Sequence, residues 1–270
     1  MIKSLNKEEI QLIHYKKKDN GKNDWVVFIH PLGGSSVTYY KQLKDFQKNF
    51  NLLLIDLHGH GKSKKAITGM KPNEIAQDII DIIDKENIDS AYFVGMCLGN
   101  VVVDLIYENS PEKVKAIVYG APVKEINLFN RTLLNLGNIF KNLMPHGILY
   151  NLFALAMMPK NNHKESRQLF VKQAKKMKRS DFLDWFNLIL SNQNFYENRI
   201  IKDDNISKLY IFGSEDHLFI SKANSYVEKD KNAKLHIIDG AGHMCNIDGY
   251  KEFNNVAIEF FHYNELELSI

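Results

Sequence analysis

The sequence predicts an α/β protein with a mostly parallel central sheet, helices on both faces and a helical cap insertion. Six short apolar segments rich in β-branched and aromatic residues recur along the 270 residues, with helical patterns between them. Nearly continuous apolarity is expected of parallel strands covered on both faces, and alternation of such strands with helices indicates a parallel sheet. One long stretch without a strand pattern interrupts the alternation and predicts the insertion.

Six strands are expected, and each is bounded by Gly, Pro, Asn or Asp, which favour turns. They are residues 25–31, 50–59, 90–96, 114–122, 208–216 and 234–242. Ahead of them, residues 9–17 alternate between polar and apolar side chains. This alternation predicts an antiparallel hairpin at the edge of the sheet.

Three helices are expected between and after these strands. Residues 71–88 carry isoleucines at helical spacing, and Pro72 suits the first turn of a helix. A second helix is expected to follow Cys97, within residues 98–112, and to end before Pro111, because proline cannot continue a helix. Residues 248–264 form the last helix of the chain.

The insertion lies between the fourth and fifth strands. From about Val123 to Asn205 the strand pattern disappears, and helical segments rich in Leu, Phe and Met replace it. Their apolar faces must be buried, and the carboxyl ends of the strands, where ligands bind in open α/β sheets, are the expected place. We therefore expect a core domain of residues 1–122 and 206–270 and a helical cap of residues 123–205.

Composition argues against several classes of function. The net charge is +3 and the lysines are scattered, so nucleic acid is not an expected partner. No segment reaches the ~18 apolar residues of a membrane span, and the N-terminus lacks the apolar region of a signal peptide. With only two cysteines, a disulfide framework is not expected and the cytoplasm is the expected location.

The strongest chemical signal is Cys97, which stands between two glycines in the pattern G-x-C-x-G. A strand precedes it and a helix follows, as in a nucleophile elbow, where small flanking residues allow a turn tight enough to present the nucleophile. The free N–H groups and the dipole of the helix N-terminus would favour a thiolate there. The alternative is a tight strand-to-helix crossing with a buried, inert thiol.

At this point the sequence resembles the α/β-hydrolase fold family over nearly its whole length. The matching segments occur in the family's order: HPLGG (30–34), DLHGHGKS (56–63), GMCLG (95–99), GSEDHL (213–218) and GAGH (240–243). Each segment alone is a weak or moderate signal, whereas the ordered set is strong. In the family these segments follow strands of the central sheet and carry the active site.

The resemblance implies a catalytic triad of Cys97, Asp216 and His243, in the chain order nucleophile, acid, base. His243 would exchange a proton with the thiol and the leaving group, and Asp216 would fix the imidazole tautomer. Taken singly, Asp216 could instead cap a short helix, and His243 could be a loop histidine packed on the core. Glu125, just past the fourth strand, is the second candidate for the acid.

The resemblance also assigns an oxyanion hole to the backbone N–H groups of Leu32 and Leu98. Pro31 departs from the family pattern, in which glycine is common, because proline fixes φ and removes an N–H. Leu32 keeps its own N–H, so the hole is retained. Ser35 or Ser36 could add a hydroxyl, although capping of the next helix is the favoured role for a serine there.

Other side chains are assigned to the substrate site or to the core. Met96, His217 and Met244 adjoin the triad positions and are expected to line the substrate site, which favours an uncharged acyl group. Cys245 is expected to be a small buried residue. His58 and His60 have no second cluster of ligands nearby in the sequence, so neither a metal nor another cofactor is expected.

The sequence therefore predicts an acyl hydrolase that acts on carboxylic esters or thioesters of a small molecule through a thioester acyl-enzyme. With cysteine at the elbow, the sequence is similar to the dienelactone hydrolases and polyhydroxyalkanoate synthases, whose elbows also read G-x-C-x-G. Two alternatives remain open. One is an acyltransferase that uses the same acyl-enzyme, and the other is a ligand-binding member of the fold with weak catalysis.

Overall fold

The computed structural model describes residues 13–123, 145–191, 205–228 and 230–268. Within them, seven strands form one sheet in the order β1-β3-β2-β4-β5-β6-β7. Their bounds are β1 Tyr15–Lys18, β2 Trp25–Ile29, β3 Asn51–Ile55, β4 Ala91–Met96, β5 Val114–Gly120, β6 Ser207–Gly213 and β7 Ala233–Ile238. All six expected strands are present, and the predicted α/β fold with a mostly parallel sheet is confirmed.

The expected edge hairpin is wrong in its pairing. β1 is antiparallel, as expected, but it pairs with β3, with Tyr15 opposite Ile55, and not with β2, which follows it in the chain. Both edges of β2 are occupied, by β3 on one side and β4 on the other. The outer edge of β3 is therefore where β1 can add its backbone hydrogen bonds.

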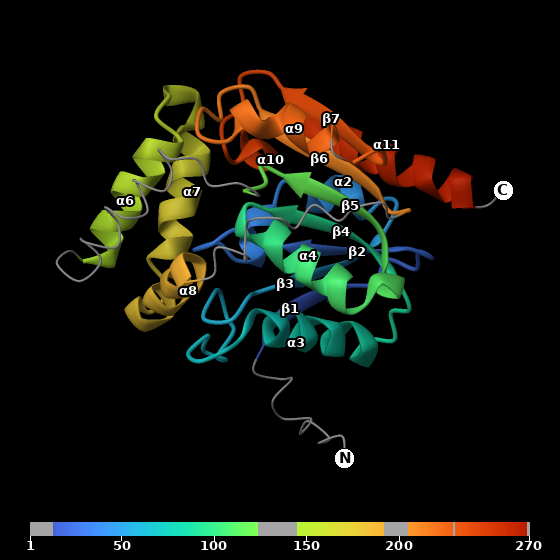
Figure 1. Cartoon of the computed structure of the whole chain (residues 1–270), viewed down its shortest axis with the longest axis horizontal. Helices are drawn as coiled ribbons and strands as arrows, with labels where there is room; N and C mark the ends of the chain where they lie inside the picture. The colour runs from blue at the N-terminus through green and yellow to red at the C-terminus, as the bar shows by residue number, and fades with distance from the viewer. Residues whose placement is uncertain (1–12, 124–144, 192–204, 229, 269–270) are drawn as a thin grey trace, which may run out of the picture.

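Helices cover both faces of the sheet (Figure 1). One face carries α3 (Pro72–Lys85) and α4 (Leu98–Asn109), and the other carries α2 (Leu43–Phe46), α10 (Cys245–Asp248) and α11 (Tyr250–Leu268). The expected helices start and end close to their predicted positions, and Pro72 occupies the first position of α3. The shorter elements are η1 Ser36–Tyr39, η2 Pro111–Lys113, η5 Ile220–Lys222 and α9 Ala223–Glu228.

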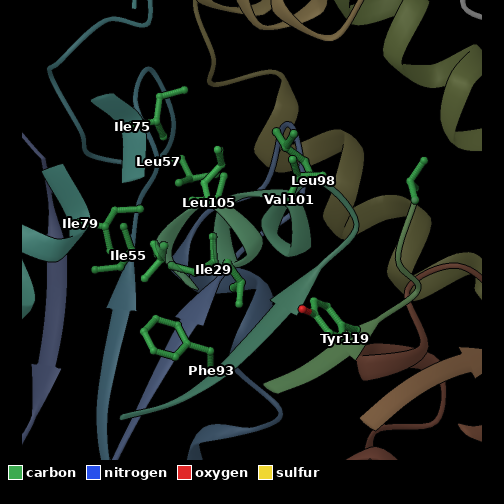
Figure 2. Close-up of a cluster of buried hydrophobic side chains, with 14 of the residues drawn as sticks. Ile29, Ile55, Leu57, Ile75, Ile79, Phe93, Leu98, Val101, Leu105 and Tyr119 are labelled. Atoms are coloured by element: carbon green, nitrogen blue, oxygen red, sulfur yellow. The ribbon is translucent and has the colours of Figure 1, made fainter. Parts of the chain in front are cut away.

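The central strands contribute alternate side chains to two hydrophobic cores. On β2, Val27 and Ile29 face the core beneath α3 and α4, whereas Val26 and Phe28 face the core beneath α11. This double burial explains why the strands are apolar at nearly every position. Figure 2 shows the first core, in which side chains of α4 pack near those of β2 and β4: Leu98, Val101, Leu105, Ile29 and Phe93.

Three helices of the insertion are described, α6 (His146–Met157), α7 (Lys164–Ala174) and α8 (Arg179–Ser191), with η3 (Asn161–His163) between the first two. They gather at one side of the molecule (Figure 1), beside the loops that follow the parallel strands. Trp185 of α8 donates its indole N–H to the carbonyl of His58 at 2.9 Å. Gln173 of α7 accepts a hydrogen bond from Ser35 at 3.2 Å. The parts of the expected cap over residues 124–144 and 192–204 lie outside the described residues.

Among the helices that the structure describes, none combines the length and the apolar character that a bilayer span requires.

Candidate active site

Cys97 sits at the sharp turn between β4 and α4. Its backbone has φ 51° and ψ −113°, a left-handed conformation that is uncommon for a residue with a side chain. The carbonyl of Gly120 holds the turn from the neighbouring strand, because it accepts hydrogen bonds from the Cys97 N–H at 3.0 Å and the Asn100 side-chain amide at 2.9 Å. Cys97 is partly exposed.

The two glycines of the motif allow this turn because their missing side chains leave no clash. A Cβ on Gly95 would lie 2.5 Å from the Asn100 side chain, and a Cβ on Gly99 would lie 2.0 Å from the carbonyl oxygen of Ile29. Both distances are shorter than a carbon atom allows, so α4 can begin this close to β2 and β4 only with glycine at these positions. The G-x-C-x-G pattern is thus explained by packing on both sides of Cys97.

His243 and Asp216 form a buried pair near the ends of β7 and β6. Nδ1 of the imidazole and Oδ2 of the carboxylate are 2.8 Å apart, and both side chains are at most 2% exposed. This contact fixes the imidazole with Nδ1 toward the carboxylate and leaves Nε2 to act on another group. Among the described residues, Nε2 makes no hydrogen bond of full geometry.

The charge state of His243 is set by three opposing influences. Burial disfavours the charged imidazole, but the Asp216 carboxylate and the nearby Cys97 sulfur favour it more strongly, and together they raise the pKa of His243 to about 10. The imidazole is therefore held as an imidazolium near neutral pH. Its two flanking groups, a carboxylate and a sulfur, are the neighbours that a thiol-based acid–base site requires.

The loop after β2 presents one of the expected oxyanion donors. Gly34 donates its N–H to the Pro31 carbonyl at 2.9 Å, and Gly33 has φ 73°, which together define a type II turn with Leu32 as its first central residue. In the part of the chain that the structure describes, neither Leu32 nor Leu98 donates its backbone N–H to a protein acceptor. Both N–H groups therefore stay available.

Three side chains were expected to line the substrate site, and their surroundings differ. Met96 is fully buried in the core beneath α11. Met244 is 1% exposed and packs in the core beneath α3 and α4. His217 is exposed. The structure thus places Met96 away from the sheet face to which Leu98 belongs.

Several other expectations have an outcome here. Cys245 is fully buried, as expected, and its thiol donates to the carbonyl of Ile211 at 3.7 Å. Ser35 caps η1 by accepting the N–H of Val37 at 3.2 Å. Glu125 lies outside the described residues. Within those residues, no group of three His, Cys, Asp or Glu side chains is arranged to hold a metal ion.

Sequence patterns did not reveal several neighbours of Cys97, Asp216 and His243. Phe219 packs against His243 with ring centroids 5.1 Å apart, and Asn100 braces the Cys97 turn. Glu215, next to Asp216, accepts hydrogen bonds from the insertion residues Lys160 and Asn162 at 2.7 and 2.9 Å. Of these residues, only Asn100 had a signal in the sequence, because it is a polar residue in the first turn of an otherwise apolar helix.

Comparison with known proteins agrees with this architecture. "Putative esterase/lipase 2" of Mycoplasma genitalium is 22% identical over 253 residues, which cover 90% of this chain and 91% of that protein. "Dihydrolipoyllysine-residue acetyltransferase component of acetoin cleaving system" of Cupriavidus necator is 26% identical over 111 residues, which cover 41% of this chain but 29% of that protein. The structure of a hydrolase from Oleispira antarctica superimposes with a TM-score of 0.82 at 14% identity, covering 97% of this chain and 99% of its own.

The sequence model of the alpha/beta hydrolase fold matches residues 24–250, which include every strand from β2 to β7 and the loops that hold Cys97, Asp216 and His243. On this match, the chain belongs to the alpha/beta hydrolase fold family.

Proposed function

We propose that this protein hydrolyses carboxylic esters or thioesters, with Cys97 as nucleophile, His243 as general acid–base and Asp216 as the residue that orients His243. The observation that carries the proposal is the buried His243–Asp216 contact at 2.8 Å, with the imidazole charge also stabilised by the Cys97 sulfur. An imidazole between a carboxylate and a thiol has the arrangement of a nucleophilic triad.

The reaction proceeds in two balanced halves. The His243 imidazolium already carries the proton of the thiol, so Cys97 attacks as a thiolate: its sulfur forms a bond to the substrate carbonyl carbon, whose oxygen takes the negative charge. When the carbonyl reforms, the bond to the leaving alcohol or thiol breaks, and His243 returns the proton to that group. Water then attacks the thioester while the neutral His243 takes one of its protons. Breaking of the bond to sulfur releases the carboxylic acid and restores the Cys97 thiolate beside the His243 imidazolium.

The oxyanion formed in each half needs hydrogen-bond donors already in position. The N–H groups of Leu98 and Leu32 fit this role because neither is used within the described residues. Leu98 is the first residue of α4, so its N–H also lies at the positive end of the helix dipole. Donors of this kind typically contribute a factor of about 10²–10³ to the rate constant kcat.

The insertion fits the role of a cap over this site, and its character favours an uncharged substrate. Tyr150 of α6 and Ala174 of α7 approach the type II turn of residues 31–34, here called the oxyanion turn. A Cβ on Gly33 would lie 3.0 and 3.1 Å from them. Phe219 adds an aromatic ring beside His243. Apolar walls around a few polar groups are typical of sites for uncharged acyl groups.

The names of similar proteins support an ester bond as the target. The Mycoplasma genitalium relative that matches along 90% of the chain carries the name esterase/lipase, and an Escherichia coli relative, "Esterase YbfF", is 27% identical over 96 residues that cover 36% of this chain and 37% of that protein. Neither name specifies an acyl group.

Alkylation of Cys97 tests this function. Turnover of a short-chain p-nitrophenyl ester should fall in proportion to the fraction of Cys97 modified by iodoacetamide, and an excess of ester should protect the thiol. Cys97→Ala should abolish turnover, whereas Cys245→Ala, at a buried thiol, should retain it. Ester turnover that survives complete alkylation of Cys97 would contradict the mechanism, and ligand-induced thermal stabilisation without any turnover would indicate a binding protein.

A second candidate, acyl transfer, is favoured by the cysteine itself. A thioester is more electrophilic than an oxygen ester, so the Cys97 intermediate can pass its acyl group to an alcohol, amine or thiol as well as to water. The name of the Cupriavidus necator relative specifies an acetyltransferase, although the match covers 29% of that protein. Mass spectrometry of products formed with added acceptors decides between the two, because unchanged hydrolysis with every acceptor excludes transfer.

A further inference from the structure

The turn that presents the Leu32 N–H is held by two buried histidines from different loops. His30 directly follows β2, and His60 belongs to the loop after β3. Their side chains are at most 1% exposed, and their ring centroids are 4.9 Å apart. Neither residue belongs to the proposed triad, and together they contact two successive peptide groups of the turn.

His30 fixes the peptide group that contains the Leu32 N–H. Its Nε2 accepts the backbone N–H of Leu57 at 2.9 Å, so this nitrogen carries no hydrogen and Nδ1 must be the protonated one. Nδ1 then donates to the carbonyl of Pro31 at 2.8 Å. Because a peptide group is planar, fixing the Pro31 carbonyl also fixes the direction of the Leu32 N–H on the opposite side of the same plane.

His60 fixes the next peptide group in the same way. Its Nε2 accepts the N–H of Gly33 at 2.9 Å, and its Nδ1 donates to the carbonyl of His58 at 2.9 Å. A turn with glycine at its second central position can change between types I and II when the central peptide rotates, because glycine tolerates both signs of φ. The hydrogen bond to His60 holds that peptide in the type II orientation.

Both imidazoles must be neutral to accept these N–H groups. Burial lowers the pKa of His30, and burial together with the nearby His30 lowers the pKa of His60 well below its ordinary value. His60 also packs edge-on against Trp185 of α8, with ring centroids 5.7 Å apart. Its ring therefore has a packing contact as well as an accepting nitrogen, and an experiment has to separate the two.

We infer that His60 is a positioning residue for catalysis: by accepting the Gly33 N–H, it holds the peptide beyond Leu32 and thereby keeps the Leu32 N–H aimed at the substrate oxyanion. His30 sets the peptide before Leu32, so both peptide planes that flank the donor are fixed. This inference rests on the proposed function, and it adds a residue from the loop after β3 to the catalytic arrangement.

Two substitutions of His60 separate its role as the acceptor of the Gly33 N–H from its packing against Trp185. His60→Phe keeps a ring against Trp185 but removes the acceptor, and His60→Gln offers an amide oxygen at similar reach but no ring. We expect His60→Phe to lower kcat for ester hydrolysis by about tenfold or more with little change in KM, because the lost interaction acts on the transition state. His60→Gln should retain most of kcat. The same two changes at His236, a partly exposed residue of β7 that pairs with Glu252, should leave kcat unchanged.

Two further measurements make the result independent of folding and of the proposed function. Alkylation of Cys97 by iodoacetamide forms no oxyanion, so its rate should be equal in wild type and both His60 variants. Amide hydrogen exchange at Gly33 should accelerate in His60→Phe and be slow again in His60→Gln. A folded His60→Phe protein with wild-type kcat, or His60→Gln losing as much kcat as His60→Phe, overturns the role of His60. Turnover that survives alkylation of Cys97 instead overturns the proposed function.

Discussion

At the scale of single residues, Asp216 determines both the orientation and the charge of His243. Its carboxylate lies 2.8 Å from Nδ1 of the imidazole in a fully buried setting, where an ionic hydrogen bond is strong. An asparagine at the same position would keep the shape but lose the charge and, through its NH₂ group, favour the opposite tautomer. The imidazolium of His243 would then be less stable beside the Cys97 sulfur, and Cys97 would be a weaker nucleophile.

We therefore expect Asp216→Asn to reduce kcat for ester hydrolysis by about a thousandfold or more, as loss of the acid does in other triads. Steady-state kinetics with a short-chain ester measures the effect. The control is Asp239→Asn, because Asp239 is an exposed residue after β7 that contacts Ser214 and not the imidazole. Similar kcat values for Asp216→Asn and wild type would exclude Asp216 as the acid.

The raised pKa of His243 also predicts how stability depends on pH. The pKa rises from 6.5 in the unfolded chain to about 10 in the folded one, against the effect of burial and because of Asp216 and Cys97. The imidazolium thus stabilises the folded state fully below pH 6.5, and this contribution is lost as pH rises toward 10. Urea unfolding should show the free energy of unfolding declining over this range in wild type, and declining much less in Asp216→Asn. Parallel curves for the two proteins would show that Asp216 does not raise this pKa.

Motifs pointed to the residues of the proposed triad but not to their neighbours, for a physical reason. Cys97 could be identified because the elbow demands small residues on both sides, a constraint that leaves a local pattern. Phe219 acts through a contact with His243, which is distant in sequence, and such a contact leaves no pattern in a single chain. Met96 adjoins Cys97 and was therefore expected in the substrate site. Because side chains alternate between the two faces of β4, the Met96 side chain instead points into the core beneath α11.

At the scale of elements, one turn of the insertion connects the loops that carry Asp216 and His243. Lys160 and Asn162 bind the Glu215 carboxylate, and Asn162 also donates to the carbonyl of Gly240 at 2.8 Å. The His163 ring covers Gly242 so closely that a Cβ there would lie 2.7 Å from it. Residues 160–163 therefore touch both positions that immediately precede Asp216 and His243.

Glu215→Gln should loosen this connection, because it removes the charge that binds Lys160. The hydrogen bond from Asn162 and the charge of Lys160 lower the pKa of Glu215 to about 2, so the carboxylate is ionised at neutral pH. We expect faster amide hydrogen exchange over residues 158–166 and a severalfold lower kcat, measured by mass spectrometry and ester kinetics. Glu252→Gln, which removes a comparable carboxylate paired with His236, is the matched control. Unchanged exchange over residues 158–166 would show that Glu215 does not hold the turn.

The sequence predicted the identity and order of the strands better than their ends. Each expected strand overran its true C-terminal end, except β4, because apolar loop residues such as Leu57 continue into the core beyond β3. The edge pairing of β1 depends on which strand edges remain free, and this is a property of the assembled sheet. Local patterns therefore locate elements, whereas tertiary contacts determine where the elements end and pair.

At the scale of the whole molecule, parallel topology explains how the site is assembled. All strands from β2 to β7 run in one direction, so the loops after β2, β3, β4, β6 and β7 meet at one edge of the sheet although they span more than 200 residues of sequence. A buried amide network joins the segments behind these loops: Asn246 donates to the carbonyl of Thr38 at 3.2 Å, and Gln42 donates to the carbonyl of Asn246 at 2.7 Å. The helices that follow the oxyanion turn and the His243 loop are thereby tied together.

The two cysteines can report separately on the site and on the global fold. Cys97 is partly exposed at the edge where the loops meet, whereas Cys245 is fully buried beneath α11, and burial raises the pKa of its thiol. Since the thiolate is the reacting form, Cys245 should react only when the core around it opens. We expect labelling of native protein to modify Cys97 quickly and Cys245 very slowly, with the two sites assigned by peptide mass spectrometry.

In a Cys97→Ser background, the labelling rate of Cys245 should rise with urea in parallel with global unfolding monitored by tryptophan fluorescence. The physical reason is that Cys245 belongs to the core that joins the sheet to the C-terminal helix α11, so access to its sulfur requires separation of these two layers. Labelling of Cys245 that is fast without urea, or that does not depend on urea, would show that α11 separates from the sheet locally. The loop that carries His243, which leads directly into Cys245, would then lack the rigid support that a positioned base requires.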